Sequence, residues 1–176
     1  KKVRARVGEQ VAGIDTSKIF ISTTHTHQAP VVMRGNFIIP EGVMTIGEYI
    51  DFFAERVSAA VVEALGNVER GSVAWGLGDA LVAYNRRAAY ANGRSAMYGD
   101  VGKSNFKGPE GAEYQGVPTL FFFDSKGKPL AAAVNVWSPS QESFGGNRIS
   151  ADFWHPVRQR LKAALDKDLV VLGWCG

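Results

Sequence analysis

Two histidines stand two residues apart in this sequence, directly after an apolar run. His25 and His27 follow residues 19–21, and on an extended backbone residues i and i+2 project to the same face. Two imidazoles placed in this way could bind one metal ion together, or one could bind metal while the other transfers a proton. The same spacing is compatible with a turn whose histidines simply face water.

The apolar run predicts the element that positions these histidines. Residues 18–23 are expected to form a buried strand that ends in the turn, because α/β proteins bind ligands where strands end. Two other polar clusters, residues 84–87 and 138–141, also follow apolar segments. Their shared position at strand ends predicts that the three clusters converge on one site.

The remaining patterns predict three helices and a mixed sheet. Helices are expected over residues 1–11, from a cap at Thr45 to about residue 65, and over residues 153–165. Extended segments are expected over 68–84 and 169–172, with a hairpin formed by 119–124 and 130–137. Residues 88–114 are expected to form a long polar loop. This order indicates a single α/β domain over 1–176, with mixed β-sheets flanked by helices.

Composition excludes several classes of function. The net charge is +3, and the basic residues are scattered along the sequence, which argues against a nucleic-acid-binding protein. The single cysteine, Cys175, excludes an internal disulfide and a cysteine-rich zinc module. No apolar run approaches the roughly 20 residues of a membrane span, so no integral membrane segment is expected. The sequence does not determine the oligomeric state.

Several ordered motifs resemble those of one enzyme family. Residues 22–30 (STTHTHQAP) resemble the Thr-His-Thr-His-Ser-Gly/Ala-Pro signature of the neutral/alkaline, non-lysosomal ceramidases and their bacterial relatives. Residues 84–87 (YNRR) are similar to the Asn-Arg element of that family. The stretches 124–135 (DSKGKPLAAAVN) and 149–153 (ISADF) resemble its Asp-x-x-Gly-Lys-Pro hairpin and its Ile-Ser-Ala-Asp-Tyr motif.

The resemblance implies a location, a reaction and a substrate. The chain would be an incomplete, internal part of a catalytic domain, from a protein that is secreted or periplasmic. The family hydrolyses an amide through a water activated by zinc, so the expected substrate is a small-molecule or lipid amide. A zinc ion with an open position makes hydroxide near neutral pH and polarises the carbonyl under attack.

The same resemblance assigns candidate roles to individual residues. His25 would be a zinc ligand, and His27 would assist proton transfer or stabilise the oxyanion. Asp152 would be a second catalytic residue that orients an imidazole, although its place at the start of a helix also suits an N-terminal acid. The residues expected to bind substrate are Asn85, Arg86, Ser138 and Gln141.

One position departs from the family pattern. Family members carry a histidine, the second zinc ligand, where this chain has Ser138, and a serine hydroxyl is a poor zinc ligand compared with imidazole. Either the site is rebuilt around Ser138, Ser140 and Gln141, or the metal is lost. The first hypothesis is therefore a zinc-dependent hydrolase, and the alternative is a catalytically altered member that binds a small polar or sugar-like ligand in the same cleft. A serine-dependent hydrolase is a third option, which no Gly-x-Ser-x-Gly motif supports.

Overall fold

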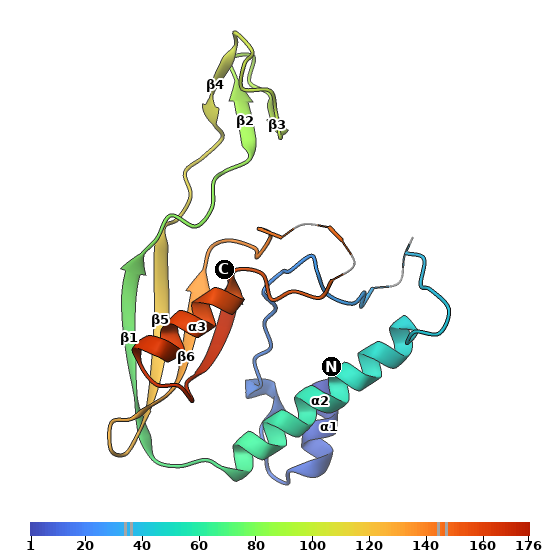
Figure 1. Ribbon diagram of the computed structural model, residues 1–176, viewed down its shortest axis with the longest axis vertical. Helices are drawn as coiled ribbons and strands as arrows, with labels where there is room; N and C mark the ends of the chain where they lie inside the picture. The colour runs from blue at the N-terminus through green and yellow to red at the C-terminus, as the bar shows by residue number, and fades with distance from the viewer. Residues whose placement is uncertain (34, 36, 144, 147) are drawn as a thin grey trace.

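The computed structural model describes residues 1–33, 35, 37–143, 145–146 and 148–176. Its elements form a pair of helices, a four-stranded sheet with one helix on it, and a separate three-stranded sheet (Figure 1). The expected α/β class with mixed sheets and flanking helices is confirmed. Within the described residues, no helix is both long enough and apolar enough to cross a membrane.

The two N-terminal helices pack against each other. Helix α1 (Lys2–Gln10) buries Val3 and Val7 against Ala54 of helix α2 (Ile46–Gly66). The predicted capping box starts α2: the Thr45 hydroxyl accepts from the Glu48 amide at 3.3 Å, and the Glu48 carboxylate accepts from the Thr45 amide at 2.7 Å. These bonds satisfy two of the amide donors that a helix N-terminus leaves unpaired. A short 3-10 helix, η1 (Thr16–Lys18), follows α1.

The main sheet carries the strand order β1-β5-β6-β7. Strand β1 (Gly71–Asp79) pairs antiparallel with β5 (Gly116–Asp124), which forms the predicted hairpin with β6 (Pro129–Val136). Strand β7 (Val170–Cys175) lies parallel to β6, after the crossover helix α3 (Trp154–Ala164). Helix α3 covers one face of the sheet. The buried core there consists of Ala132, Val134, Val136, Trp154, Leu169 and Val171.

A second sheet occupies the stretch that was expected to be a loop. Strands β2 (Arg87–Tyr90), β3 (Ser95–Met97) and β4 (Phe106–Pro109) pair antiparallel in the order β3-β2-β4. This β2–β4 sheet projects beyond the ends of β1 and β5 on two connecting segments (Figure 1). The prediction of a loop over 88–114 was wrong because strands of three or four residues, interrupted by turns, leave no readable alternation.

The strand predicted over residues 18–23 is also absent. Residues 19–26 have no regular secondary structure, and no described strand pairs with them. The apolar side chains of this segment are not buried, since Phe20 is 72% exposed and Ile21 is 43% exposed. The carbonyl oxygen of Thr24 instead accepts two hydrogen bonds from Ser140, in the loop that follows β6. The histidine segment is therefore positioned by a loop and not by a sheet. The expected extension of β1 over residues 80–84 likewise forms no strand.

Candidate functional site

A cleft of about 690 Å³ lies between the connecting segments and the loop after β6. Its walls come from residues 82–87, from residues 112–113 and from residues 137–142, with Phe153 at the start of α3. All four residues predicted to bind substrate line it: Asn85, Arg86, Ser138 and Gln141. Segments that are more than 50 residues apart in the sequence thus meet at one cavity. Its size is typical of pockets for small molecules.

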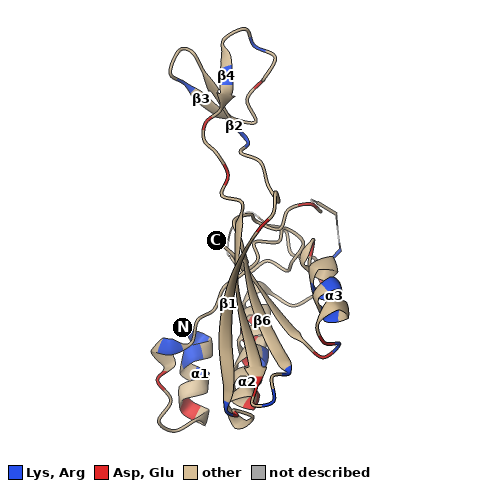
Figure 2. Ribbon diagram, turned by 90° about the vertical axis from the view of Figure 1, so that its left-hand side faces the viewer, with Lys and Arg blue, Asp and Glu red and all other residues tan. Residues whose placement is uncertain are grey.

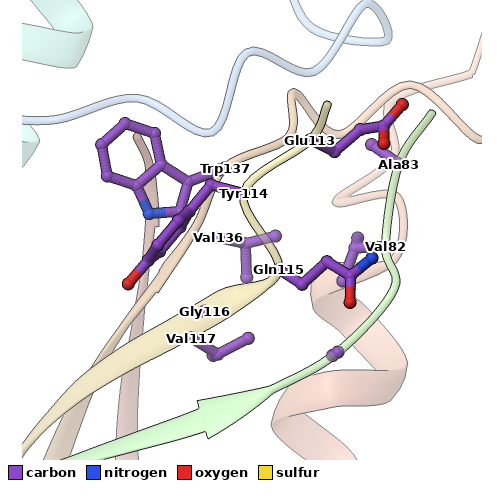
Figure 3. Close-up of a pocket in the computed structure, with 10 residues that line it drawn as sticks. Val82, Ala83, Glu113, Tyr114, Gln115, Gly116, Val117, Val136 and Trp137 are labelled. Carbon is purple, nitrogen blue, oxygen red and sulfur yellow. The ribbon is translucent and has the colours of Figure 1, made fainter. Parts of the chain in front are cut away.

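A much smaller hollow adjoins the cleft at the start of β5. Its volume is about 10 Å³, which leaves room for one water molecule and no substrate group. Figure 3 shows the rings of Tyr114 and Trp137 beside each other there, with centroids 5.3 Å apart in an edge-to-face arrangement. The Glu113 side chain points toward the opposite connecting segment, which carries Ala83 (Figure 3). This aromatic contact joins the neck of the projecting sheet to the end of β6.

Asn85 links the two connecting segments. Its backbone amide donates to the Glu113 carboxylate, its side-chain amide donates to the Gly111 carbonyl at 3.1 Å, and its side-chain oxygen accepts from the Arg87 amide at 2.9 Å. The hydrogen bond from the Asn85 amide holds the pKa of Glu113 below its ordinary value. These bonds tie the two connecting segments of the cleft wall together. The role of Asn85 in substrate binding stays a prediction.

Arg86 presents a positively charged group at the cleft. Its guanidinium donates to the Tyr98 hydroxyl at 2.6 Å and lies 5.2 Å from the centroid of the same ring. Tyr98 adopts a left-handed backbone conformation with φ of 53°, which is costly for a residue with a bulky side chain. The strained tyrosine therefore orients the guanidinium, whose other N–H groups can bind a carbonyl or carboxylate oxygen. Tyr98 gave no signal in the sequence because it lies in an apparently featureless polar stretch.

The two serines of the loop after β6 donate to backbone carbonyls. Ser138 is 7% exposed, and its hydroxyl donates to the Pro139 carbonyl at 3.0 Å. Ser140 is completely buried, and both its amide and its hydroxyl donate to the Thr24 carbonyl, at 3.0 and 2.7 Å. Within the described ranges, neither hydroxyl donates to an imidazole. Ser140 acts here as a clamp between the loop and the histidine segment.

His25 and His27 stack against each other. Their ring centroids are 5.3 Å apart and the planes differ by 18°. The predicted same-face placement thus occurs, but not on a strand, because His25 has a left-handed backbone with φ of 59°. The side-chain amide of Gln141 contacts His27 Nε2. A glutamine amide can bind a ring nitrogen through its NH₂ group or its oxygen, so this contact is compatible with either tautomer of the imidazole.

Further hydrogen bonds attach the histidine segment to the loop. The Thr26 hydroxyl donates to the Ser150 carbonyl at 3.1 Å, and the Ser150 amide donates to the Gln28 carbonyl at 3.0 Å. The Gln28 side chain donates to the Gly145 carbonyl at 2.6 Å. The imidazoles are therefore placed through contacts on both sides of them in the sequence, while the two rings are exposed.

Asp152 organises the backbone of the same loop. Its carboxylate accepts three amide hydrogen bonds, from Glu142 at 3.2 Å, Ser143 at 2.6 Å and Phe153 at 2.7 Å. It is 7% exposed and has a left-handed backbone with φ of 54°. These contacts give Asp152 a positioning role toward the loop that carries Gln141. A direct part in catalysis stays a prediction, since no described hydrogen bond joins the carboxylate to an imidazole.

The described residues do not by themselves fit a zinc site. Two imidazoles stand side by side, but no group of three or more His, Cys, Asp or Glu side chains within the described part of the chain could hold a metal ion. Ser138 is a weak donor for zinc, and its hydroxyl is directed to a backbone carbonyl. Zinc in this fold would need ligands beyond His25 and His27.

The chain has the fold of part of a neutral ceramidase. Its structure matches a crystal structure of neutral ceramidase from Pseudomonas aeruginosa with a TM-score of 0.64 and 13% sequence identity, over 98% of this chain and 27% of the other. It matches a structure of ceramidase complexed with C2 with a TM-score of 0.63 and 14% identity, over 98% and 26% of the two chains. The chain thus spans about a quarter of the length of these neighbours. No family model matches it, and no curated protein is significantly similar in sequence.

Proposed function

We propose that this chain forms the substrate cleft of a ceramidase-like hydrolase that acts on an amide bond of a lipid or small molecule. The observation that carries the proposal is the cleft itself, which unites Asn85, Arg86, Ser138 and Gln141 in a fold similar to that of neutral ceramidases. Gln141 connects the cleft to His27. A secreted or periplasmic, bacterial origin belongs to the same proposal.

The proposed roles follow from the contacts. The Arg86 guanidinium binds the polar end of the substrate, because Tyr98 holds it at the cleft and leaves several of its donors for a ligand. Gln141 orients the His27 ring through its contact with Nε2. Transfer of a proton between His27 and the reacting group is the step that this chain would supply. Zinc is implied by the sequence resemblance with His25 as a ligand, but two imidazoles do not complete a zinc site.

The test is hydrolysis of N-acyl amines by the purified natural protein. A fluorogenic N-acyl sphingosine and its ester analogue are compared, with His27→Ala as the test variant and His155→Ala as the control, because His155 is an exposed histidine that does not line the cleft. We expect His27→Ala to lower kcat about 10²-fold or more, with little effect from His155→Ala. Absence of amide hydrolysis, or equal activity of His27→Ala and wild type, would overturn the proposal.

Elemental analysis of the same protein tests the metal separately. Stoichiometric zinc that is lost in His25→Ala and kept in His155→Ala would support His25 as a ligand. Zinc that is kept in His25→Ala would contradict that role while leaving the hydrolytic proposal intact.

A second candidate is a catalytically altered relative that binds a small polar or sugar-like ligand in the same cleft. Ser138 favours it, since this side chain lies where the sequence resemblance expects a metal-binding histidine, and the cleft lining is rich in polar groups. In that case a panel of sugars and polar amides would bind saturably without turnover. Arg86→Gln would weaken their binding, and failure of every ligand to bind would reject this candidate.

A further inference from the structure

The projecting β2–β4 sheet (Figure 1) carries a second hollow, which shares no lining residue with the cleft. Its volume is about 240 Å³, and its polar and aromatic lining comprises Tyr90, Asn92, Arg94, Ser95, Lys103 and Asn105. Strands β2 and β3 with the turn between them supply Tyr90, Asn92, Arg94 and Ser95, and the loop before β4 supplies Lys103 and Asn105. The lining contains two cations and no acid, so the hollow offers mainly hydrogen-bond donors.

The two acids of this part of the chain, Glu110 and Asp100, already have hydrogen-bond partners. The Glu110 carboxylate binds the Arg87 guanidinium and the Ser95 hydroxyl, and these bonds lower its pKa to about 2. The Asp100 carboxylate accepts from the Gly102 amide at 2.8 Å. Among the described residues, no carboxylate lies within ion-pair distance of Arg94 or Lys103. The two cations therefore remain uncompensated.

The net positive charge of the chain is concentrated in residues 86–110, the segment that contains this sheet. Of 20 basic and 17 acidic residues, the segment 86–110 contains five basic and two acidic residues, which leaves 15 of each and no net charge on the remainder. Figure 2 shows Lys and Arg along the projecting sheet. The basic residues are scattered in the sequence, but the acids that would balance them are missing from this segment. A local excess of one sign attracts a ligand of the other.

Neighbouring groups complete the donor set. The Asn92 side-chain oxygen accepts from the Arg94 amide at 3.1 Å, while no described acceptor binds its Nδ2 group. The Lys103 ammonium lies 5.6 Å from the centroid of the Tyr90 ring, which is buried and fixes one wall of the hollow. The Tyr90 hydroxyl donates to the Asp100 carbonyl at 3.0 Å, so the ring cannot swing away without breaking that bond.

We propose that this hollow binds a phosphate group through Arg94, Lys103 and the amide groups of Asn92 and Asn105. A guanidinium and an ammonium next to neutral amide donors suit a compact oxyanion with several acceptor oxygens. The phosphate could be a free phosphate ester or the headgroup of an anionic lipid, and the chemistry of recognition is the same. This site is separate from the proposed substrate cleft.

Binding is measured with the natural protein in two arms. The first titrates inorganic phosphate and glycerol phosphate while the amide resonances of residues 92–95 and 103–105 are followed by NMR. The second measures sedimentation with vesicles of phosphatidylglycerol, with phosphatidylcholine vesicles as the neutral comparison. The test variant is Arg94→Gln/Lys103→Gln. The control is Arg160→Gln/Lys162→Gln, which removes the same charge from α3.

The possible results distinguish a soluble phosphate ligand from a lipid headgroup, and both from non-specific binding. Saturable shifts at this hollow with soluble phosphate, weakened about tenfold or more in the test variant and unchanged in the control, support a site for free phosphate groups. Binding to anionic vesicles alone, lost in the test variant only, supports the lipid source. Equal weakening in both double variants indicates non-specific charge and overturns the proposal, as does absence of binding in both arms.

Discussion

Replacing Asp152 by asparagine isolates the role of its carboxylate. Asparagine has nearly the same shape and adopts the left-handed backbone of this position as readily as aspartate does, so the φ of 54° is kept. The carboxylate accepts from three amides. An asparagine oxygen can replace only one side of it, and the new NH₂ group would face the Ser143 amide, donor against donor.

The size of the effect follows from these three bonds. A hydrogen bond to a charged group contributes about 1.5–3 kcal/mol, against about 0.5–1.5 kcal/mol for a neutral one. The variant loses the bond to Ser143 and weakens the other two, but Ser143 is exposed and its amide can bind water. We therefore expect a loss of about 2–3 kcal/mol in the free energy of unfolding. A local loss of about 2 kcal/mol would lower the protection of the Ser143 amide against hydrogen exchange about 30-fold.

The assay combines urea unfolding, amide hydrogen exchange and turnover. Asp168→Asn is the control, because Asp168 is a largely exposed surface acid. If Asp152→Asn unfolds within about 0.5 kcal/mol of wild type and keeps Ser143 protected, the positioning role is refuted. If such a stable variant also loses all turnover, the carboxylate acts in the chemistry, as the sequence resemblance predicts.

Three further perturbations test other parts of the fold. The folded-state pKa of Glu110 is lowered to about 2, so its contribution to stability is present above pH 4.5 and is lost as the pH falls toward 2. Glu110→Gln should remove this loss of stability at low pH. Identical pH profiles of urea unfolding for the variant and the wild type would contradict the expectation. Thr45→Ala should cost about 1 kcal/mol by removing the helix cap, and an unchanged urea midpoint would show that the cap does not stabilise α2. Gly173→Ala should lower the free energy of unfolding by about 1–3 kcal/mol, because the new Cβ would lie 2.5 Å from the Trp154 ring. Gly78→Ala is the control, since a Cβ at Gly78 would meet open space. Equal unfolding midpoints of the two variants would refute the packing argument.

The parts of the fold that the sequence predicted have strong local signals. Helix α2 has a capping box and a long apolar stripe, and the β5–β6 hairpin has turn residues between two apolar runs. The β2–β4 sheet was missed because its strands are too short to show a period. The strand predicted before His25 was wrong because an apolar run forms a strand only when another strand pairs with it, and pairing is not encoded locally.

The candidate site was predictable in outline only. The convergence of residues 84–87 and 138–141 on one cleft follows from their places after the antiparallel strand β1 and the hairpin, which the sequence indicated. The contact of Gln141 with His27 and the support of Arg86 by Tyr98 depend on side-chain directions. The spacing of residues in the sequence does not predict these contacts. The roles of these residues, and of His25 and Asp152, stay predictions.

The clamp between the histidine segment and the loop after β6 has a consequence for the order of folding. Strands β6 and β7 are joined through α3 within 47 residues of chain, 129–175, whereas the bonds from Ser140 to Thr24 and from Thr26 to Ser150 span 116 and 124 residues. Contacts between distant residues carry a larger loop-closure entropy and form later. We expect the sheet with its loop to fold first and the imidazoles to dock last. In pulse-labelling hydrogen exchange, the amides of Ser140 and Ser150 should become protected after those of β6 and β7, and simultaneous protection would contradict this order.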